Sequence, residues 1–133
     1  TTSLGFGDFN GDGRSDSLVR DGTSNTLFIG NDGLTSPWTG TLGVIGISWQ
    51  VTAIGDFNGD LRDDILWQNS DGTLWLYGMN GGAVAYQGGL PNPGPEWRVM
   101  GAGDFDGDGK SDLAWRNLST GDIYLWGMNG ASI

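Results

Sequence analysis

The sequence contains no cysteine and no histidine, and few of its charged side chains are basic. Without cysteine the chain has neither disulfide bonds nor thiolate ligands, and without histidine it lacks the most common transition-metal ligand and general base. A zinc site is therefore excluded. Long apolar runs are absent as well, so the sequence predicts no membrane-spanning helix and no signal-peptide core.

The charge that is present is acidic and local. Sixteen Asp and Glu residues stand against six Lys and Arg, which gives a formal net charge of -10 at pH 7. This balance excludes nucleic acid as a partner, because nothing in the chain neutralises a run of phosphates. Most of the aspartates fall in three short segments, and such clustering predicts cation binding. Glycine (26 residues) and tryptophan (7 residues) are abundant, a mixture typical of short strands, tight turns and aromatic packing.

The acidic segments belong to an internal repeat. The motif Gly-Asp-Phe-Asn/Asp-Gly-Asp recurs with its first aspartate at Asp8, Asp56 and Asp104, so successive copies lie 48 residues apart. The similarity extends into the flanking sequence, where Trp49-Gln-Val and Trp97-Arg-Val precede the second and third copies. The sequence therefore predicts three structural units, which span residues 1–48, 49–96 and 97–133.

Each unit contains several short strand signals bounded by turn residues. In the second unit the predicted strands cover residues 49–54, 64–68, 73–77 and 83–87. The third of these strands is apolar on consecutive residues, which indicates that both faces of its sheet are covered. A four-stranded antiparallel unit that repeats at about 40 to 50 residues predicts an all-β fold made of β-propeller blades. A β-sandwich of about twelve strands is the alternative.

The third unit stops before its outer strand, so we expect blade 3 to lack it. Propellers usually contain about four to eight blades, and three blades are too few for a ring. Exposed sheet edges are a liability for a soluble protein. We therefore expect either that the chain is a fragment of a larger propeller or that identical copies assemble to complete one.

The acidic segments have the ligand pattern of a calcium loop. In the first copy, side-chain oxygens occupy positions 1, 3, 5 and 9, at Asp8, Asn10, Asp12 and Asp16, and position 7 adds the carbonyl of Arg14. Calcium takes about six to eight oxygen ligands, and alternate residues of a tightly curled loop provide them. These residues could instead cap turns. Four converging acceptors would then repel one another without a cation.

With these loops the sequence resembles the integrin-like FG-GAP or VCBS repeat family, whose loop Asp-x-Asp/Asn-x-Asp-Gly-x-x-Asp joins strands one and two of a propeller blade. The resemblance covers nearly the whole chain and implies up to three Ca²⁺ ions. The implied metal ligands are Asp8, Asn10, Asp12, Arg14, Asp16, Asp56, Asn58, Asp60, Arg62, Asp64, Asp104, Asp106, Asp108, Lys110 and Asp112, with the arginines and the lysine acting through their carbonyls. The second loop departs from the pattern because Leu61 replaces the glycine, at a cost of about 1 kcal/mol for a left-handed backbone.

A ligand face is predicted opposite the calcium loops. Antiparallel strand order places the turns between strands two and three there, where tryptophans lie beside amide and guanidinium groups. The candidate ligand-binding residues are Trp49, Trp67, Trp97, Trp115, Arg20, Gln68 and Arg116. The tryptophans could instead pack between blades. We expect core positions for Trp75, Tyr77, Tyr124 and Trp126.

The sequence thus predicts a calcium-stabilised, non-catalytic binding module that recognises a glycan or polysaccharide. Abundant extracellular calcium and the resemblance favour a secreted or cell-surface protein. A protein–protein adhesion or assembly scaffold is the first alternative, in which exposed aromatics such as Trp38 and Tyr86 would make contacts. A polysaccharide-degrading enzyme is the second, and its carboxylate candidates are few, namely Asp21, Asp71, Asp122 and Glu96. We therefore predict that the protein is not an enzyme.

Overall fold

The computed structural model describes residues 2–9, 11, 13, 16–21, 26–29, 40–44, 48–80, 83–130 and 133. The described residues form strands and connecting loops and no helix, which confirms the all-β prediction. Among them there is accordingly no helix of the length and apolarity that crossing a membrane requires.

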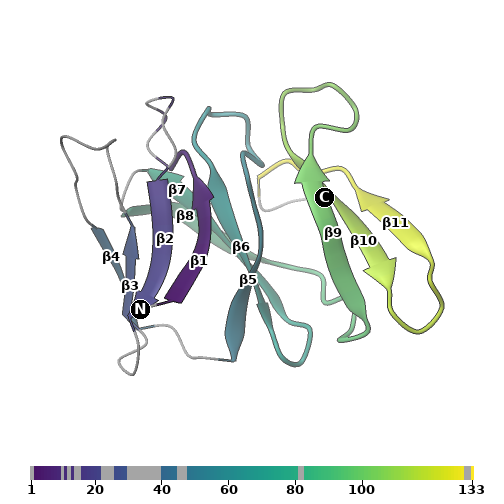
Figure 1. Ribbon diagram of the computed structural model, residues 1–133. Coiled ribbons are helices and arrows are strands. Elements are labelled where there is room, and N and C mark those ends of the chain that lie inside the picture. Colours follow the sequence, from purple (N-terminus) through teal and green to yellow (C-terminus); the bar gives the residue numbers. More distant parts are fainter. Residues whose placement is uncertain are drawn as a thin grey trace.

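The strands form three separate antiparallel sheets (Figure 1), which we call blades 1, 2 and 3. Blade 1 contains β1 (Thr2–Gly7), β2 (Asp16–Asp21), β3 (Thr26–Ile29) and β4 (Gly40–Val44). Blade 2 contains β5 (Trp49–Gly55), β6 (Asp64–Asn69), β7 (Leu74–Asn80) and β8 (Ala83–Leu90). Blade 3 contains β9 (Trp97–Gly103), β10 (Asp112–Asn117) and β11 (Ile123–Trp126). Three sheets of three or four strands do not fit the sandwich alternative, in which two sheets face each other.

Neighbouring strands of each sheet are consecutive in the chain, so every blade is a meander. The first strands β1, β5 and β9 lie side by side, and the acidic loops that follow them gather at one end of the blades (Figure 1). Each first strand carries a register shift at the equivalent position, namely Leu4, Thr52 and Met100. The repeat in the sequence is therefore a repeat in backbone geometry.

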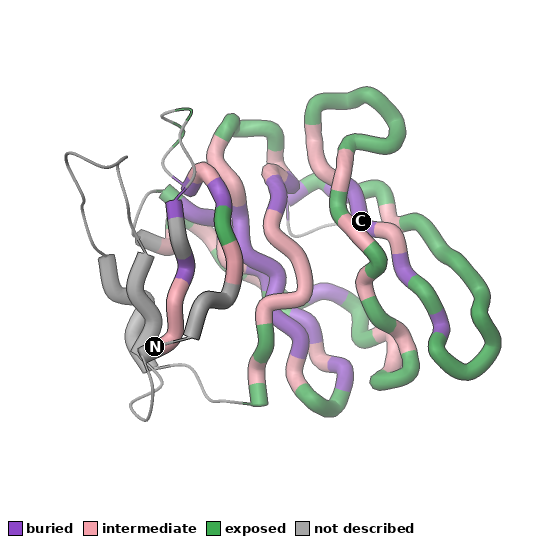
Figure 2. Tube along the Cα trace, in the orientation of Figure 1, coloured by how far each residue is buried: buried purple, intermediate pink, exposed green. Residues whose placement is uncertain are grey.

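Two apolar clusters lie between the blades and hold them together. Buried stretches of the chain, drawn in purple, accordingly run through the middle of the molecule in Figure 2. The cluster between blades 1 and 2 contains Phe9, Leu18, Ile65, Trp67 and Met79. The cluster between blades 2 and 3 contains Phe57, Leu66, Leu74, Leu76, Leu90, Leu113, Trp115 and Met128. Strand β6 contributes to both clusters, because consecutive residues of a strand point to opposite faces. This is why β6 is apolar without alternation, whereas burial alternates along the first part of β7, where the expectation of two covered faces does not hold at Trp75.

Two of the four predicted core aromatics are not in the core. Trp75 and Tyr124 are exposed, whereas Tyr77 and Trp126 are half-buried against the clusters. The indole of Trp75 donates to the side-chain oxygen of Gln87 of β8 (3.0 Å), a bond within blade 2. Tyr124 lies in β11, which is the edge strand of the described part of blade 3. The core prediction for Trp75 and Tyr124 is therefore wrong.

Candidate functional site

The loop between β9 and β10 brings four carboxylates together. Ligand oxygens of Asp104, Asp106, Asp108 and Asp112 all lie within 4.8 Å of one another. Two oxygens that share a calcium ion lie at most about 5 Å apart, because each Ca–O bond is about 2.3 to 2.6 Å long. The cluster therefore fits a hard divalent cation, and its donor set is all oxygen. Four of the predicted metal ligands thus form a site that could hold a metal ion.

The backbone of this loop curls around its first residue. The carboxylate of Asp104 accepts hydrogen bonds from the amides of Gly107 (2.8 Å), Asp108 (3.1 Å) and Gly109 (2.8 Å). Gly107 and Gly109 have φ angles of 77° and 84°, a region that glycine adopts without strain. The amide hydrogen bonds, led by that of Gly109, lower the pKa of Asp104 and favour its charged form. The Asp-x-Asp-x-Asp-Gly pattern is therefore also what folds the loop.

The last carboxylate of the cluster anchors the loop to the sheet. Asp112, the first residue of β10, is buried and accepts hydrogen bonds from the amides of Phe105 (3.1 Å) and Met128 (2.9 Å). Loss of hydration raises the pKa of Asp106, and its side-chain interaction with Asp108 and the charges of Asp108 and Asp112 add to that rise. A bound cation would offset that repulsion, which is a physical reason for calcium at this place.

The loop between β5 and β6 repeats these hydrogen bonds, although its aspartates are not among the described carboxylates that converge closely enough to hold a metal ion. Asp56 accepts hydrogen bonds from the amides of Gly59 (2.8 Å), Asp60 (3.1 Å) and Leu61 (2.8 Å). Leu61 has a φ of 68°, and it is the one non-glycine residue with positive φ among the described residues. The predicted left-handed leucine is thus confirmed. The side-chain amide of Asn58 donates a hydrogen bond from its Nδ2 to Oδ2 of Asp60 over 3.3 Å.

Asp64 is the counterpart of Asp112 and is more deeply enclosed. Its carboxylate accepts hydrogen bonds from the amides of Phe57 (3.1 Å) and Met79 (3.0 Å) and from the hydroxyl of Tyr86 (3.4 Å). Burial raises the pKa of Asp64 to about 7, and the charges of nearby Asp60 and Asp56 add to that rise. Tyr86, an adhesion candidate in the sequence, is half-buried and committed to this network.

The first loop keeps the framework where it is described. Asp8 accepts hydrogen bonds from the amides of Gly11 and Gly13 (both 2.9 Å), and Asp16 accepts one from the amide of Phe9 (3.0 Å). The predicted ligands Asn10, Asp12 and Arg14 lie outside the described residues. In the other two loops, the amides of Arg62 and Lys110 donate to Asp60 and Asp108 (both 2.9 Å). The role of their carbonyls stays a prediction.

The acidic loops of neighbouring blades are in contact. The amide of Ser111 donates to the carbonyl of Asp56 over 2.7 Å. A Cβ atom on Gly59 would lie 3.2 Å from Cγ of Lys110, and one on Gly11 would lie 3.1 Å from the carbonyl oxygen of Leu61. The glycine at position 4 of the motif therefore allows the next loop to approach closely. The loops form a row along one end of the blades.

The structure divides the predicted ligand-binding residues into two groups. Trp67 and Trp115 are buried between blades, so their rings are not available for stacking on a ligand, and this part of the prediction is corrected. The guanidinium of Arg20 donates to the backbone carbonyl of Trp49 (2.8 Å), and the side-chain amide of Gln68 donates to the backbone carbonyl of Trp97 (3.4 Å). Arg20 and Gln68 thus tie one blade to the next. Arg116, at the equivalent position of blade 3, is exposed.

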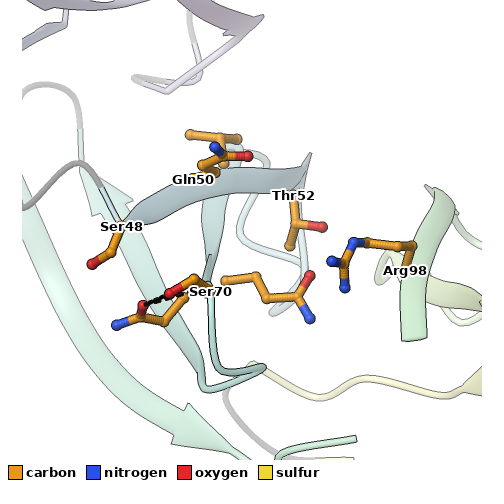
Figure 3. A pocket seen from close by; sticks show the side chains of 8 residues that line it. Ser48, Gln50, Thr52, Ser70 and Arg98 are labelled. Atoms are coloured by element: carbon orange, nitrogen blue, oxygen red, sulfur yellow. Dashed lines mark hydrogen bonds between the residues drawn. The ribbon is translucent and has the colours of Figure 1, made fainter. Parts of the chain in front are cut away.

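At the end of the blades opposite the acidic loops there is an open groove of about 520 Å³ (Figure 3). Strand β5 and the end of β6 form most of it, and Arg98 of β9 points into it from blade 3 (Figure 3). Its lining is Ser48, Gln50, Val51, Thr52, Gln68, Asn69, Ser70 and Arg98. Of these only Gln68 was predicted. Sequence analysis could have found Gln50 and Arg98, because both are polar residues between two apolar neighbours and they occupy equivalent positions in successive repeats.

A second pocket, of about 210 Å³, is lined by aromatic residues and one proline. Its lining is Pro93, Trp97, Trp115, Tyr124 and Trp126. The rings of Trp115 and Trp126 are 5.0 Å apart at their centroids. Trp97 is half-buried, and its role in ligand binding stays a prediction. Trp49 is likewise half-buried.

The structure describes only some of the residues behind the two alternative functions. Trp38 and the side chain of Asp21 lie outside the described residues. Asp71 accepts a hydrogen bond from the amide of Thr73 (2.9 Å), and bonding to Thr73 lowers its pKa. This is the geometry of a capped turn and does not distinguish Asp71 as a catalytic acid.

Three consecutive blades that carry the same acidic loop define a repeat protein with β-propeller-like architecture. A family model described as FG-GAP-like repeat matches residues 8–67 and again residues 56–115, which together make up most of the sequence. The chain belongs to the FG-GAP-like repeat family. Neither the curated proteins nor the solved structures include a significant match to the chain.

Proposed function

We propose that the chain is part of a β-propeller and acts as a calcium-stabilised, non-catalytic module that recognises carbohydrate outside the cell. The observation that carries the calcium part is the convergence of Asp104, Asp106, Asp108 and Asp112 within 4.8 Å. The same loop framework recurs in blade 2 and in the described part of blade 1. In this function the metal holds the loops and the contacts between blades, and performs no chemistry on a substrate.

The groove carries the recognition part of the proposal. Its polar lining consists of hydroxyls, carboxamides and one guanidinium, and it includes no carboxylate and no lysine. Such groups donate to and accept from the hydroxyls of a sugar, which are themselves both donors and acceptors. The surrounding protein has a net charge of -10. A neutral polyhydroxylated ligand therefore suits the groove better than a polyanion does.

The aromatic pocket supplies the second element of sugar recognition. Trp97 and Tyr124 offer apolar ring faces on which the C–H face of a pyranose can stack. Trp97 and Arg98 are consecutive residues of β9 and so point to opposite faces of the strand, which makes the aromatic pocket and the groove two separate candidate subsites.

A glycan array probed in the presence of calcium tests the proposal, followed by calorimetry with the best ligand. Gln50→Ala and Arg98→Ala should each weaken binding by about tenfold, the loss of about one net hydrogen bond. Gln87→Ala is the matched control, because Gln87 is an exposed amide on β8, away from the groove. Silence across a broad glycan panel, or equal loss in all three variants, would contradict carbohydrate recognition at the groove.

A further inference from the structure

The groove between blades 2 and 3 contains a single charged side chain. Arg98 of β9 is exposed and points into the groove toward Thr52 of β5 (Figure 3). The other polar residues of the lining carry hydroxyls and carboxamides. Asp71 of the β6–β7 turn and Glu96 of the β8–β9 connection are not part of the lining. The groove therefore has a positive charge and no negative charge to balance it.

One nitrogen of the Arg98 guanidinium is held by the backbone. Nη1 donates to the carbonyl of Trp97 over 3.0 Å and also to the carbonyl of Pro95. Both N–H groups of Nη1 thus have acceptors within the protein. These two hydrogen bonds fix one edge of the guanidinium and so determine the direction in which the other edge points.

The other edge of the guanidinium is formed by Nε and Nη2. Neither of these nitrogens has a hydrogen-bond acceptor among the described residues. The one ion pair in the described part of the chain joins Arg62 to Asp60, so Arg98 has no carboxylate partner there. The N–H groups of Nε and Nη2 form a planar fork that matches both oxygens of a carboxylate. Arg98 therefore presents a fixed, bidentate donor to the groove.

The fold itself does not require a cation at this position. Arg20 has a structural role, because its half-buried guanidinium donates to a backbone carbonyl of blade 2 over 2.8 Å. At the next boundary Gln68 makes the equivalent bond to blade 3. The residue of blade 2 that corresponds to Arg98 is the neutral Gln50. The guanidinium of Arg98 is thus better explained by a ligand than by packing of the blades.

Neutral groups of the same groove are also available to a ligand. The side-chain oxygen of Asn69 accepts hydrogen bonds from the amide and the hydroxyl of Ser70 (2.7 and 3.2 Å), which leaves its NH₂ group to donate. Gln50 is exposed, and its carboxamide can both donate to and accept from a sugar hydroxyl. The groove thus combines donors for one carboxylate with groups suited to neutral hydroxyls.

We propose that the groove recognises an acidic sugar, a uronate or sialate unit whose carboxylate binds Nε and Nη2 of Arg98, within an otherwise neutral glycan. This inference rests on the proposed carbohydrate recognition and names its ligand class. One guanidinium balances one carboxylate. A run of carboxylates would meet no second cation in the lining and would be repelled by a chain of net charge -10.

Calorimetry in calcium with matched ligand pairs tests the ligand class. Each pair consists of an oligosaccharide that ends in a uronate or a sialate and the same oligosaccharide with that carboxyl group reduced to an alcohol. The acidic member of the recognised pair should bind about 10- to 100-fold more tightly, the gain expected from charge-assisted hydrogen bonds. Equal affinity for both members of every pair would overturn the inference.

Variants at Arg98 test the assignment of the carboxylate. Arg98→Gln should bind the acidic and the reduced member alike, because it removes the charge and the fork. Arg98→Lys should keep only part of the preference, since an ammonium group is a point charge without a fork. Gln50→Ala is the comparison, and it should weaken both members by the same factor and keep the preference. A preference that persists in Arg98→Gln would overturn the role of Arg98.

Failure of this inference can be distinguished from failure of carbohydrate recognition. Binding of both members without preference, weakened in both by Gln50→Ala, would overturn the acidic ligand and leave carbohydrate recognition standing. Absence of binding by both members of every pair would overturn both proposals. A peptide of similar size with a free C-terminal carboxylate is the last probe. If it bound as tightly as the acidic oligosaccharide, the assignment to a sugar would be overturned.

Discussion

The backbone amide of Asp63 donates to the carbonyl of Asp8 over 2.7 Å, and the carboxylate of Asp63 accepts a hydrogen bond from the amide of Asp8 over 2.9 Å. This two-way link joins the acidic loops of blades 1 and 2. Between blades 2 and 3 the equivalent backbone hydrogen bond is present, from the amide of Ser111 to the carbonyl of Asp56. The acidic loops are therefore structural joints between blades as well as candidate metal sites, and changes in them should alter the stability of the whole chain.

Replacement of Asp63 by asparagine should destabilise the protein less than replacement by alanine, because asparagine removes the charge but keeps a hydrogen-bond acceptor. Asp63→Ala leaves the amide of Asp8 without its acceptor and should lower the free energy of unfolding by about 1 kcal/mol. Asp63→Asn keeps an acceptor there. Burial, together with the nearby charges of Asp8, Asp56 and Asp60, raises the pKa of Asp63, so removal of the charge should stabilise the metal-free protein. Urea unfolding in chelator measures both variants, and equal effects would show that the hydrogen bond is unimportant.

The left-handed leucine should be a site of removable strain. Leu61 has a φ of 68°, whereas Gly13 and Gly109 occupy its position in the other loops with φ angles of 83° and 84°. Leu61→Gly should stabilise the protein by about 0.5 to 1 kcal/mol, because the relief of strain exceeds the added entropy of the unfolded chain. The reciprocal change Gly109→Leu should destabilise it by about 1 to 2 kcal/mol. Thermal melts of the two variants should therefore move in opposite directions.

Much of the architecture could be predicted because it depends on local spacing. The 48-residue period, the strands of blade 2 and the left-handed position of Leu61 all follow from short motifs that determine their own backbone. The hydrogen bonds around Asp104 show why, since the residues that would bind the metal also fold the loop. The conformation of such a loop can be predicted from its sequence without knowledge of the rest of the fold, because local hydrogen bonds determine it.

The side chains that depend on a neighbouring blade could not be predicted as well. Trp67 and Trp75 both lie in blade 2, yet one is buried and the other is exposed. The difference arises from whether another blade packs against that part of the sheet, and the strand pattern does not contain that information. The groove around Gln50 and Arg98 was missed for the same reason, because it forms where two blades meet.

Loss of one carboxylate from the third loop should weaken calcium binding and its effect on stability. At a calcium concentration about 100 times the dissociation constant, one site stabilises the folded chain by about 2.7 kcal/mol. Asp108→Asn should remove most of this gain, whereas Asp122→Asn, an exposed aspartate outside the cluster, should keep it. Melting temperatures in calcium and in chelator provide the comparison. An unmodified protein that melts identically in both would contradict calcium stabilisation.

The metal-free protein should become less stable as the pH rises from about 4 to about 7. Burial raises the pKa of Asp64 from 3.8 to about 7, so in this range the folded chain holds a proton that the unfolded chain has released. The stabilisation from this proton is complete below pH 3.8 and is lost as the pH rises through about 7. Asp63 and Asp106, whose pKa values are also raised, act in the same direction. Calcium should reverse the trend, because protonation of a ligand competes with the metal. Melts across this range in chelator and in calcium should therefore have slopes of opposite sign, and parallel slopes would show that these carboxylates do not bind the cation.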